Sequence, residues 1–392
     1  MDRYTVIIMV ILAVFTTRSQ LYKQNKERKE TGKYNGLPLK FKRGRALFPV
    51  FERFKYYLFS ANQKVGKSKL VDDLFVYYPI EMRIQGKPLF TKILYFSLEE
   101  TEDLKGSQAD CHFLYETFGF RVSPKELKSL SCDCPQDVLD KLNDPRVQAY
   151  IKDLEENVTY ISDIKNPTGI YKEIKKWMET IGHHNYVEGL RQDPITNEWV
   201  KGQVIDKKNP FTLNNSETFP IVIIDNFANL STERGWDLRQ TIEKMSKYCI
   251  ELSQLGLIIV AVQHQAQSQE SLENLKYSQI VPTVNGLGDA KTTARDAFAT
   301  FGLFSPFRFQ IQNHLGYDVT KFKDYLRFLY IISDRDGAVG TIIPLLFKGD
   351  VSKFEELPKP QELATLEELR KQLNMEEEEF EKTFQIHNQS DL

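Results

Sequence analysis

Residues 61–68 have the types and the spacing of a phosphate-binding loop. The segment ends in Gly-Lys-Ser, and alanine stands where the usual G-x-x-x-x-G-K-[ST] pattern has its first glycine. In such a loop, backbone N–H groups surround phosphate oxygens, the lysine reaches the β- and γ-phosphates, and the serine hydroxyl ligates Mg²⁺. We therefore expect a nucleotide site built by Ala61, Asn62, Gln63, Lys64, Val65, Gly66, Lys67 and Ser68.

The residues on either side of this loop favour the same interpretation. Residues 56–60 are aromatic and apolar, as a buried strand requires. After the loop, apolar residues recur at helical spacing up to Tyr78, and we expect Pro79 to end that helix. The alternative is a chance Gly-Lys-Ser in a surface turn, which the strand–loop–helix order makes the weaker interpretation.

Three further polar residues directly follow apolar runs that are typical of strands. Glu99 follows residues 94–98, Asp225 follows residues 221–224, and His264 follows residues 260–263. In open α/β sheets, ligands bind beyond the carboxyl ends of the strands, so these side chains are expected to converge on one bound nucleotide.

Each of these residues suits one task in phosphoryl transfer to water. We expect Asp225 to hold Mg²⁺, Glu99 to activate the attacking water, and His264 to sense the γ-phosphate. The alternatives are a helix N-cap role for Asp225, a base role for Glu100 or Glu102, and a purely structural hydrogen bond for His264.

Composition restricts the class of protein. The chain has 392 residues, 41% of them hydrophobic, which is enough for one large core with a small appendage. The net charge of −2 excludes a global basic field of the kind found in nucleic-acid-coating proteins, so any DNA contact must be local. Four cysteines without a disulfide pattern or a C-x₂-C knuckle suit a reducing cytoplasm and a structural role.

The alternation of apolar runs with amphipathic helices predicts an α/β fold with a mostly parallel twisted sheet flanked by helices. We expect three parts: an apolar and basic extension at 1–34, a main domain at 35–357 with an insertion at about 183–219, and an acidic helical tail at 358–392. A capping box at 365–368 is expected to open the tail helix, which we expect to be solvated more readily than partner-binding.

The extension contains an unbroken apolar run of ten residues, 6–15. A membrane-spanning helix needs about twenty, so no membrane partner is expected. A signal-like segment, a docking helix and upstream sequence outside the functional domain all remain compatible with this run.

The ordered set of motifs resembles the RecA-like motor domain of DnaB-type replicative helicases, in a divergent, phage-like form. The motifs are residues 61–68, Ser97-Leu98-Glu99-Glu100, Ile223-Ile224-Asp225-Asn226-Phe227, Val262-Gln263-His264-Gln265 and Asp334-Arg335-Asp336-Gly337. The resemblance covers about residues 35–357. It implies Glu99 as the catalytic base, His264 as the γ-phosphate sensor and Arg335 as an arginine finger acting on a neighbouring subunit. Ser333 stands where that family usually has a lysine.

The resemblance also implies partners. It predicts ATP and Mg²⁺ as cofactors, a homo-oligomer that is a hexameric ring, single-stranded DNA at a replication fork, and a primase or loader. DNA contacts are expected from the segment after His264, with Lys276, Lys291 and Arg295 as the basic contributors. The expected location is the cytoplasm, that of the host if the protein is phage-encoded. Two other interpretations stay open: a RecA-type recombination or repair ATPase without unwinding, and a nucleotide-gated assembly protein.

Overall fold

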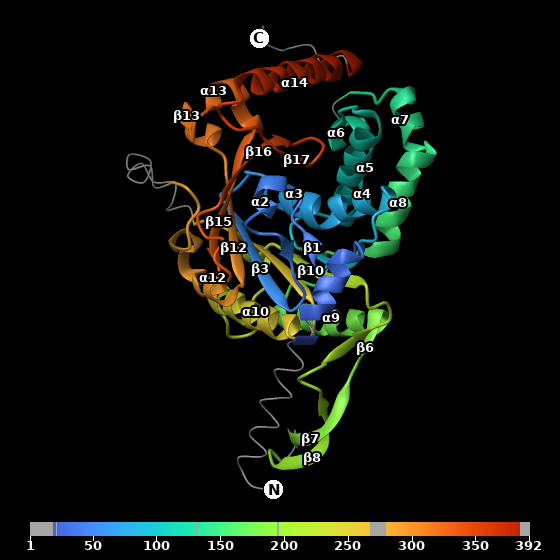
Figure 1. The fold of residues 1–392 in the computed structure, drawn as a ribbon, viewed down its shortest axis with the longest axis vertical. Coiled ribbons are helices and arrows are strands. Elements are labelled where there is room, and N and C mark those ends of the chain that lie inside the picture. Colours follow the sequence, from blue (N-terminus) through green and yellow to red (C-terminus); the bar gives the residue numbers. More distant parts are fainter. Residues whose placement is uncertain (1–18, 21, 131, 194–195, 267–279, 385–392) are drawn as a thin grey trace.

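The computed structural model describes residues 19–20, 22–130, 132–193, 196–266 and 280–384. Its centre is a nine-stranded sheet with the order β17-β16-β15-β12-β3-β11-β10-β4-β5 (Figure 1). The strands are β3 (Lys55–Ala61), β4 (Phe90–Ser97), β5 (Val158–Ile161), β10 (Thr218–Asp225), β11 (Ile258–His264), β12 (Ala299–Phe304), β15 (Leu326–Asp334), β16 (Ile342–Lys348) and β17 (Lys353–Glu356). Strands β3, β4, β10 and β11 lie at the four apolar runs that the sequence marks as strands.

Six strands, from β12 to β5, run parallel, whereas β15, β16 and β17 are antiparallel additions at one edge. The parallel strands are apolar at successive positions because both faces of the sheet are covered. The expected α/β class with a mostly parallel, helix-flanked sheet is therefore confirmed.

Alternate residues of the central parallel strands enter two separate cores. Tyr57 and Phe59 of β3 face one core, and Tyr56 and Leu58 face the other. The first core is covered by α3 (Lys67–Val71), the π-helical turn η1 (Asp72–Tyr77), α4 (Tyr78–Ile84), α5 (Glu102–Phe118) and α8 (Pro145–Asn157). The second is covered by α9 (Pro167–Ile181), α10 (Leu238–Ser253) and α12 (Thr292–Asp296) (Figure 1).

The helix after the phosphate-binding loop does not end at Pro79, so that expectation is wrong. The chain stays helical from Lys67 to Ile84, with the π-helical turn η1 in its middle. Proline lacks the N–H that an interior α-helical position would use. It lies at the first turn of α4, directly after the π-turn, where that missing donor is tolerated.

The stretch expected as an insertion forms an arm of paired strands that extends away from the sheet (Figure 1). Strands β6 (Gly182–His184) and β9 (Phe211–Leu213) pair at its base, and β7 (Tyr186–Gln192) and β8 (Trp199–Ile205) pair beyond them. Leu190 and Trp199 expose more than 60% of their surface on this arm.

Short elements complete the chain. They are β1 (Leu37–Pro38), β2 (Val50–Phe51), α2 (Lys42–Arg45), α6 (Pro124–Leu127), α7 (Gln136–Leu142), η2 (Phe227–Asn229), η4 (Asn285–Ala290), η5 (Phe307–Phe309), β13 (Asn313–His314), β14 (Tyr317–Asp318), α13 (Val319–Phe322) and η6 (Lys323–Tyr325). Those between β12 and β15 enclose their own small core with buried Tyr317 and Phe322.

The C-terminal helix α14 (Leu363–Thr383) begins two residues before the expected capping box, with Glu362 as an N-cap that makes no side-chain cap bond. Its Leu366 and Leu373 are buried against the small core between β12 and β15. The tail is therefore a packed helix, and the expectation of a solvated one is wrong for this face.

The N-terminal part is described only from residue 19 onward, so the apolar run 6–15 lies outside the described residues. Residues 22–30 are helical, and Arg28 pairs with Glu217 at 2.9 Å, close to the base of the arm.

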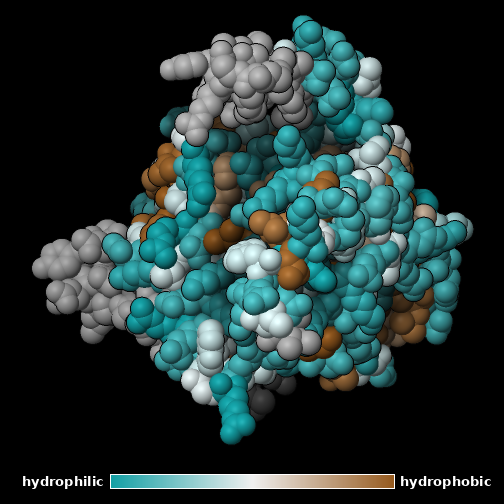
Figure 2. Space-filling model, turned by 90° about the horizontal axis from the view of Figure 1, so that it is seen from below, coloured by the Kyte–Doolittle hydropathy of each residue, from teal (hydrophilic) through white to brown (hydrophobic). Residues whose placement is uncertain are grey.

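No helix in the described ranges is both long and apolar enough to cross a bilayer. Viewed from below, the surface is mostly hydrophilic, with hydrophobic residues in small separate groups (Figure 2).

Candidate functional site

The phosphate-binding loop has the strand–turn–helix geometry that its sequence predicts. Strand β3 ends at Ala61, and α3 begins at Lys67. Gly66 has φ = 101°, and a Cβ there would lie 2.9 Å from the ring of Phe347, so glycine is required at this position. Ala61 is still paired as a strand residue with His264 and Leu303, which explains why the first glycine of the pattern is dispensable here.

Lys67 lies at the centre of the loop and is 7% exposed. Its Nζ lies 2.9 Å from Nδ1 of His264. Burial lowers the pKa of Lys67 to about 8, against the opposing effect of Asp225 and Glu99. A cation with so little water around it gains much when phosphate oxygens approach, as a nucleotide site requires.

His264 lies at the carboxyl end of β11 and faces this lysine. Burial, with Lys67 as the second cause, lowers the pKa of His264 to about 4. The ring is therefore neutral at neutral pH, and Nδ1 accepts a hydrogen bond from the ammonium of Lys67.

Asn226 joins the candidate residues, although its residue type alone predicts no role for it. Its Nδ2 donates to Oε2 of Glu99 at 2.7 Å and lies 3.3 Å from Nε2 of His264. The side chain is 1% exposed, so it fixes Glu99 through this hydrogen bond and lies beside His264. Its position directly after Asp225, at a strand end, was the signal that could have identified it.

Asp225 ends β10 and is 3% exposed. The hydroxyl of Tyr95 donates to its Oδ2 at 3.0 Å, whereas its buried Oδ1 has no hydrogen-bond partner among the described residues. An unsatisfied buried carboxylate oxygen fits a hard cation such as Mg²⁺, which prefers oxygen ligands. Ser68, in the first turn of α3, is the second expected ligand and is partly buried.

A buried ammonium lies behind Asp225. Lys105 of α5 is 1% exposed and lies 2.8 Å from Oδ2 of Asp72, 3.0 Å from Oε2 of Glu100 and 3.9 Å from Oδ2 of Asp225. Burial opposes its charge, but these carboxylates outweigh burial and raise the pKa of Lys105. Glu100 is thus turned toward this cluster, and Glu99 is the member of the pair that faces Asn226 and the loop.

Replacing Lys105 by Met should destabilise the protein by about 3–5 kcal/mol, because it leaves buried carboxylates without their cation. Urea unfolding measures this loss. The double variant Lys105→Met/Asp72→Asn should lose less than the sum of the two single variants, because the pair is removed together. Strict additivity would show that Lys105 and Asp72 are not coupled.

His264 should contribute to acid sensitivity. Its pKa is about 4 in the folded chain and about 6.5 when unfolded, so on acidification the unfolded chain binds the proton first. The contribution is fully present above pH 6.5 and is lost as the pH falls toward 4. Wild type should therefore lose more unfolding free energy than His264→Gln between pH 7 and pH 5. Equal losses in urea titrations would contradict this assignment.

Strand register shows at which end of the parallel strands each residue lies. Asp225 pairs with Ser97, and Ala61 pairs with both His264 and Leu303, so the loop and the candidate residues lie together at the carboxyl ends of the parallel strands. Arg335 follows β15, whose last residue lies opposite Ala299 at the start of β12. Ala299 pairs with Tyr57, four residues or about 13 Å along β3 from Ala61.

Arg335 is exposed, and its Nη2 donates to the carbonyls of Arg295 and Asp296 at 3.0 and 3.4 Å. The structure therefore brings Glu99, Asp225 and His264 together with Lys67 but leaves Arg335 at the opposite, amino-terminal ends of the parallel strands.

Of the expected DNA-binding residues, Lys276 lies outside the described residues, whereas Lys291 and Arg295 are exposed next to or within α12.

A cavity of about 790 Å³ lies beside α3, the helix that follows the loop. Lys69 of α3, Phe347, Gly349, Phe307, Arg121 and Tyr325 line it. Its size is within the usual range for small-ligand sites, and it offers aromatic rings and basic groups beside the helix that carries Lys67.

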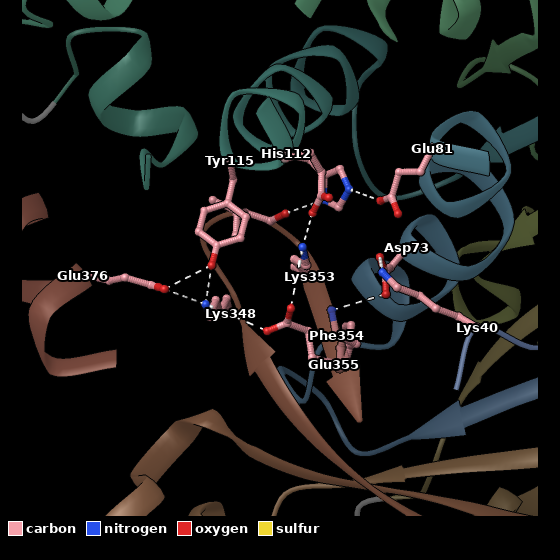
Figure 3. A network of polar contacts seen from close by, with 12 residues as sticks. Lys40, Asp73, Glu81, His112, Tyr115, Lys348, Lys353, Phe354, Glu355 and Glu376 are labelled. Atoms are coloured by element: carbon pink, nitrogen blue, oxygen red, sulfur yellow. Dashed lines mark hydrogen bonds and ion pairs between the residues drawn. The ribbon is translucent and has the colours of Figure 1, made fainter. Parts of the chain in front are cut away.

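A second cluster of ionisable groups lies between α4, α5 and β17 (Figure 3). Asp73, Glu81 and His112 place potential metal-ligand atoms within 4.8 Å of one another. Their partners are protein groups: Lys40 lies 2.6 Å from Asp73, and His112 contacts Glu81 at 2.9 Å and the carbonyl of Val351 at 2.8 Å. The ammonium of Lys40 supplies the positive charge that a metal ion would otherwise supply, so we interpret this cluster as structural.

The same view shows how the acidic tail is fixed (Figure 3). Glu376 of α14 accepts from Lys348 at 2.9 Å and from the hydroxyl of Tyr115 at 3.1 Å. Lys348 ends β16, two strands away from β12 in the sheet order. A charged residue of the tail thus binds within the chain, next to the cavity-lining Phe347.

Comparison with solved structures defines the class of fold, which is the RecA-like fold found in helicase ATPase domains. The chain superposes on a DnaB-like replicative helicase, described with its interactions with primase, with a TM-score of 0.60 and 13% sequence identity, covering 88% of this chain and 66% of that one. It also superposes on a second solved structure, that of an ATPase domain, with a TM-score of 0.61 and 13% identity, covering 87% and 98% of the two chains. No protein-family model and no curated protein matches the sequence.

Proposed function

We propose that this protein is an ATP-driven replicative DNA helicase that works as a hexameric ring on single-stranded DNA. One observation supports this most strongly. The nucleotide-site residues lie at the carboxyl ends of the parallel strands, whereas Arg335 is exposed at their amino-terminal ends. An arginine so placed cannot reach the nucleotide of its own chain. It suits a finger that completes the site of a neighbouring subunit, as in a ring.

In this proposal Lys67 binds the β- and γ-phosphates, and Ser68 and Asp225 would hold Mg²⁺, which would supply positive charge to offset the charge that develops on the phosphates. Glu99, held by Asn226, accepts a proton from the attacking water. His264, whose Nδ1 accepts from Lys67, would sense nucleotide state by turning to donate its Nε2–H to the γ-phosphate side.

DNA binding is proposed for the face that carries Lys291 and Arg295, together with Lys276. A few basic residues suffice, because a ring repeats each contact in every subunit. The acidic net charge of the whole chain fits a contact confined to a channel. A primase or loader, a phage origin and a cytoplasmic location extend the same proposal.

Two alternatives share the site but differ in output. A RecA-type recombination ATPase would hydrolyse ATP on single strands without unwinding, and a nucleotide-gated assembly protein would bind ATP without turnover. The test is ATP hydrolysis measured against protein concentration, with and without single-stranded DNA. The ring proposal expects specific activity to rise with both. Binding without any turnover would favour the assembly protein.

A further inference from the structure

Arg308 lies beside the phosphate-binding loop of its own chain, although it is distant from the loop in sequence. Strand β12 runs parallel to β3 and pairs Leu303 with Ala61, so the chain leaves β12 next to the loop. Nη1 of Arg308 donates a hydrogen bond to the backbone carbonyl of Gln63, the third residue of the loop. The guanidinium thus lies at the mouth of the candidate nucleotide site.

The turn that carries Arg308 is well defined. The backbone N–H groups of Phe309 and Ile311 donate to the carbonyl of Pro306 at 3.1 and 3.2 Å. The ring of Phe309 stacks on Phe304 at 5.7 Å, inside the small core between β12 and β15. Phe307, on the other side of the arginine, lines the 790 Å³ cavity. The segment is therefore anchored to the sheet while it presents Arg308 toward the loop.

The electrostatics agree with this placement. Arg308 contacts the carbonyl of Gln63, four residues before Lys67 in the same loop, so the two cations belong to one short stretch of the site. Like charges held close together repel each other, and an anion between them turns this repulsion into attraction. A phosphate group bound by the loop would lie between the ammonium of Lys67 and the guanidinium of Arg308.

We propose that Arg308 binds the phosphates of the nucleotide in its own chain, as a second cation beside Lys67. The inference rests on the proposed nucleotide site and extends it. A guanidinium carries five N–H donors in a planar fork, so it can keep the carbonyl of Gln63 and also donate to phosphate oxygens. Arg308 would then act in cis, whereas Arg335 acts in trans.

The first test is the affinity for ATP and Mg²⁺ by titration calorimetry. Arg308→Ala should bind ATP about tenfold or more weakly, because a charge-assisted hydrogen bond is lost. Arg308→Lys should lose less. The matched control is Lys321→Ala, an exposed cation of the same segment whose partner is Asp318 at 3.8 Å, and it should bind like wild type. Unchanged affinity in Arg308→Ala would overturn the inference.

Subunit mixing tests whether Arg308 serves the site of its own chain. Mixing Arg308→Ala with Lys67→Ala should give no more ATP turnover than the two variants give separately, because each site carries one of the two defects. Mixing Arg308→Ala with Arg335→Ala should recover part of it, because some sites combine an intact loop side with an intact finger. Recovery with Lys67→Ala would show that Arg308 serves another subunit.

These outcomes separate the role of Arg308 from the proposed function. If wild type binds no ATP, the proposed function fails and this inference fails with it. If wild type binds ATP and Arg308→Ala binds it equally well at an unchanged melting temperature, only the role of Arg308 is wrong.

Discussion

Arg335→Ala is expected to reduce ATP turnover by about 10³-fold or more while leaving ATP affinity largely unchanged. An arginine supplied in trans stabilises transition-state charge and is worth about 10³ to 10⁵ in rate in other NTPases. Arg335 is exposed at the end of the strands remote from the phosphate-binding loop of its own chain, so we expect it to contribute nothing to ATP binding by that loop. Steady-state hydrolysis and calorimetric ATP binding measure the two quantities.

A mixing experiment tests the in-trans assignment directly. Lys67→Ala destroys the site on its own loop, and Arg335→Ala destroys the site of a neighbour. Mixed rings should therefore regain part of the turnover, because some interfaces pair an intact loop with an intact finger. Arg239→Ala is a useful control, since Arg239 is an exposed arginine of α10 that pairs with Glu243 at 3.2 Å. If the mixtures stay inactive, Arg335 does not act across an interface.

Glu99→Gln is expected to lower turnover by about 10²- to 10⁴-fold, the usual contribution of a general base. Glutamine keeps the shape and can still accept the hydrogen bond from Asn226, so the arrangement around His264 should persist. ATP binding should therefore survive, and single-turnover hydrolysis should be slow. This combination distinguishes loss of the base from loss of the site.

Glu102→Gln is the matched control, because Glu102 is an exposed carboxylate in the first turn of α5 and was an alternative for the base. Its turnover should equal that of wild type. A Glu102→Gln variant as slow as Glu99→Gln would move the base role along the chain.

Much of the fold could be predicted because its signals are local. The apolar runs around Tyr57 and Ile223 had to be strands buried on both faces, and the loop that joins the first of them to a helix follows from Gly66 and Lys67. Side chains that end neighbouring parallel strands must lie near each other, which brought Glu99, Asp225 and His264 together on topology alone.

The remainder depends on contacts distant in sequence. Lys105 lies inside an amphipathic helix, and nothing local says that it is buried beneath Asp225. The position of Arg308 beside the phosphate-binding loop depends on the pairing of β12 with β3, which no local signal shows. The predictions for the helix containing Pro79 and for the tail that carries Glu376 failed because a π-turn and a tertiary ion pair override the local signals.

The domain limits and the assignments of individual site residues stay predictions. The likeness to solved helicase domains concerns the fold, and it was found at 13% identity. Activity measurements must therefore decide between the helicase and the two other functions that share this site.

Strand displacement is the measurement that decides whether the protein is a helicase. A forked DNA with a 5′ single-stranded tail is incubated with ATP and Mg²⁺, and wild type is compared with Lys67→Ala. We expect wild type to separate the strands and Lys67→Ala to leave them paired. ATP hydrolysis stimulated by single-stranded DNA, with no displacement by wild type over a range of protein concentrations, would contradict the helicase and favour the recombination ATPase.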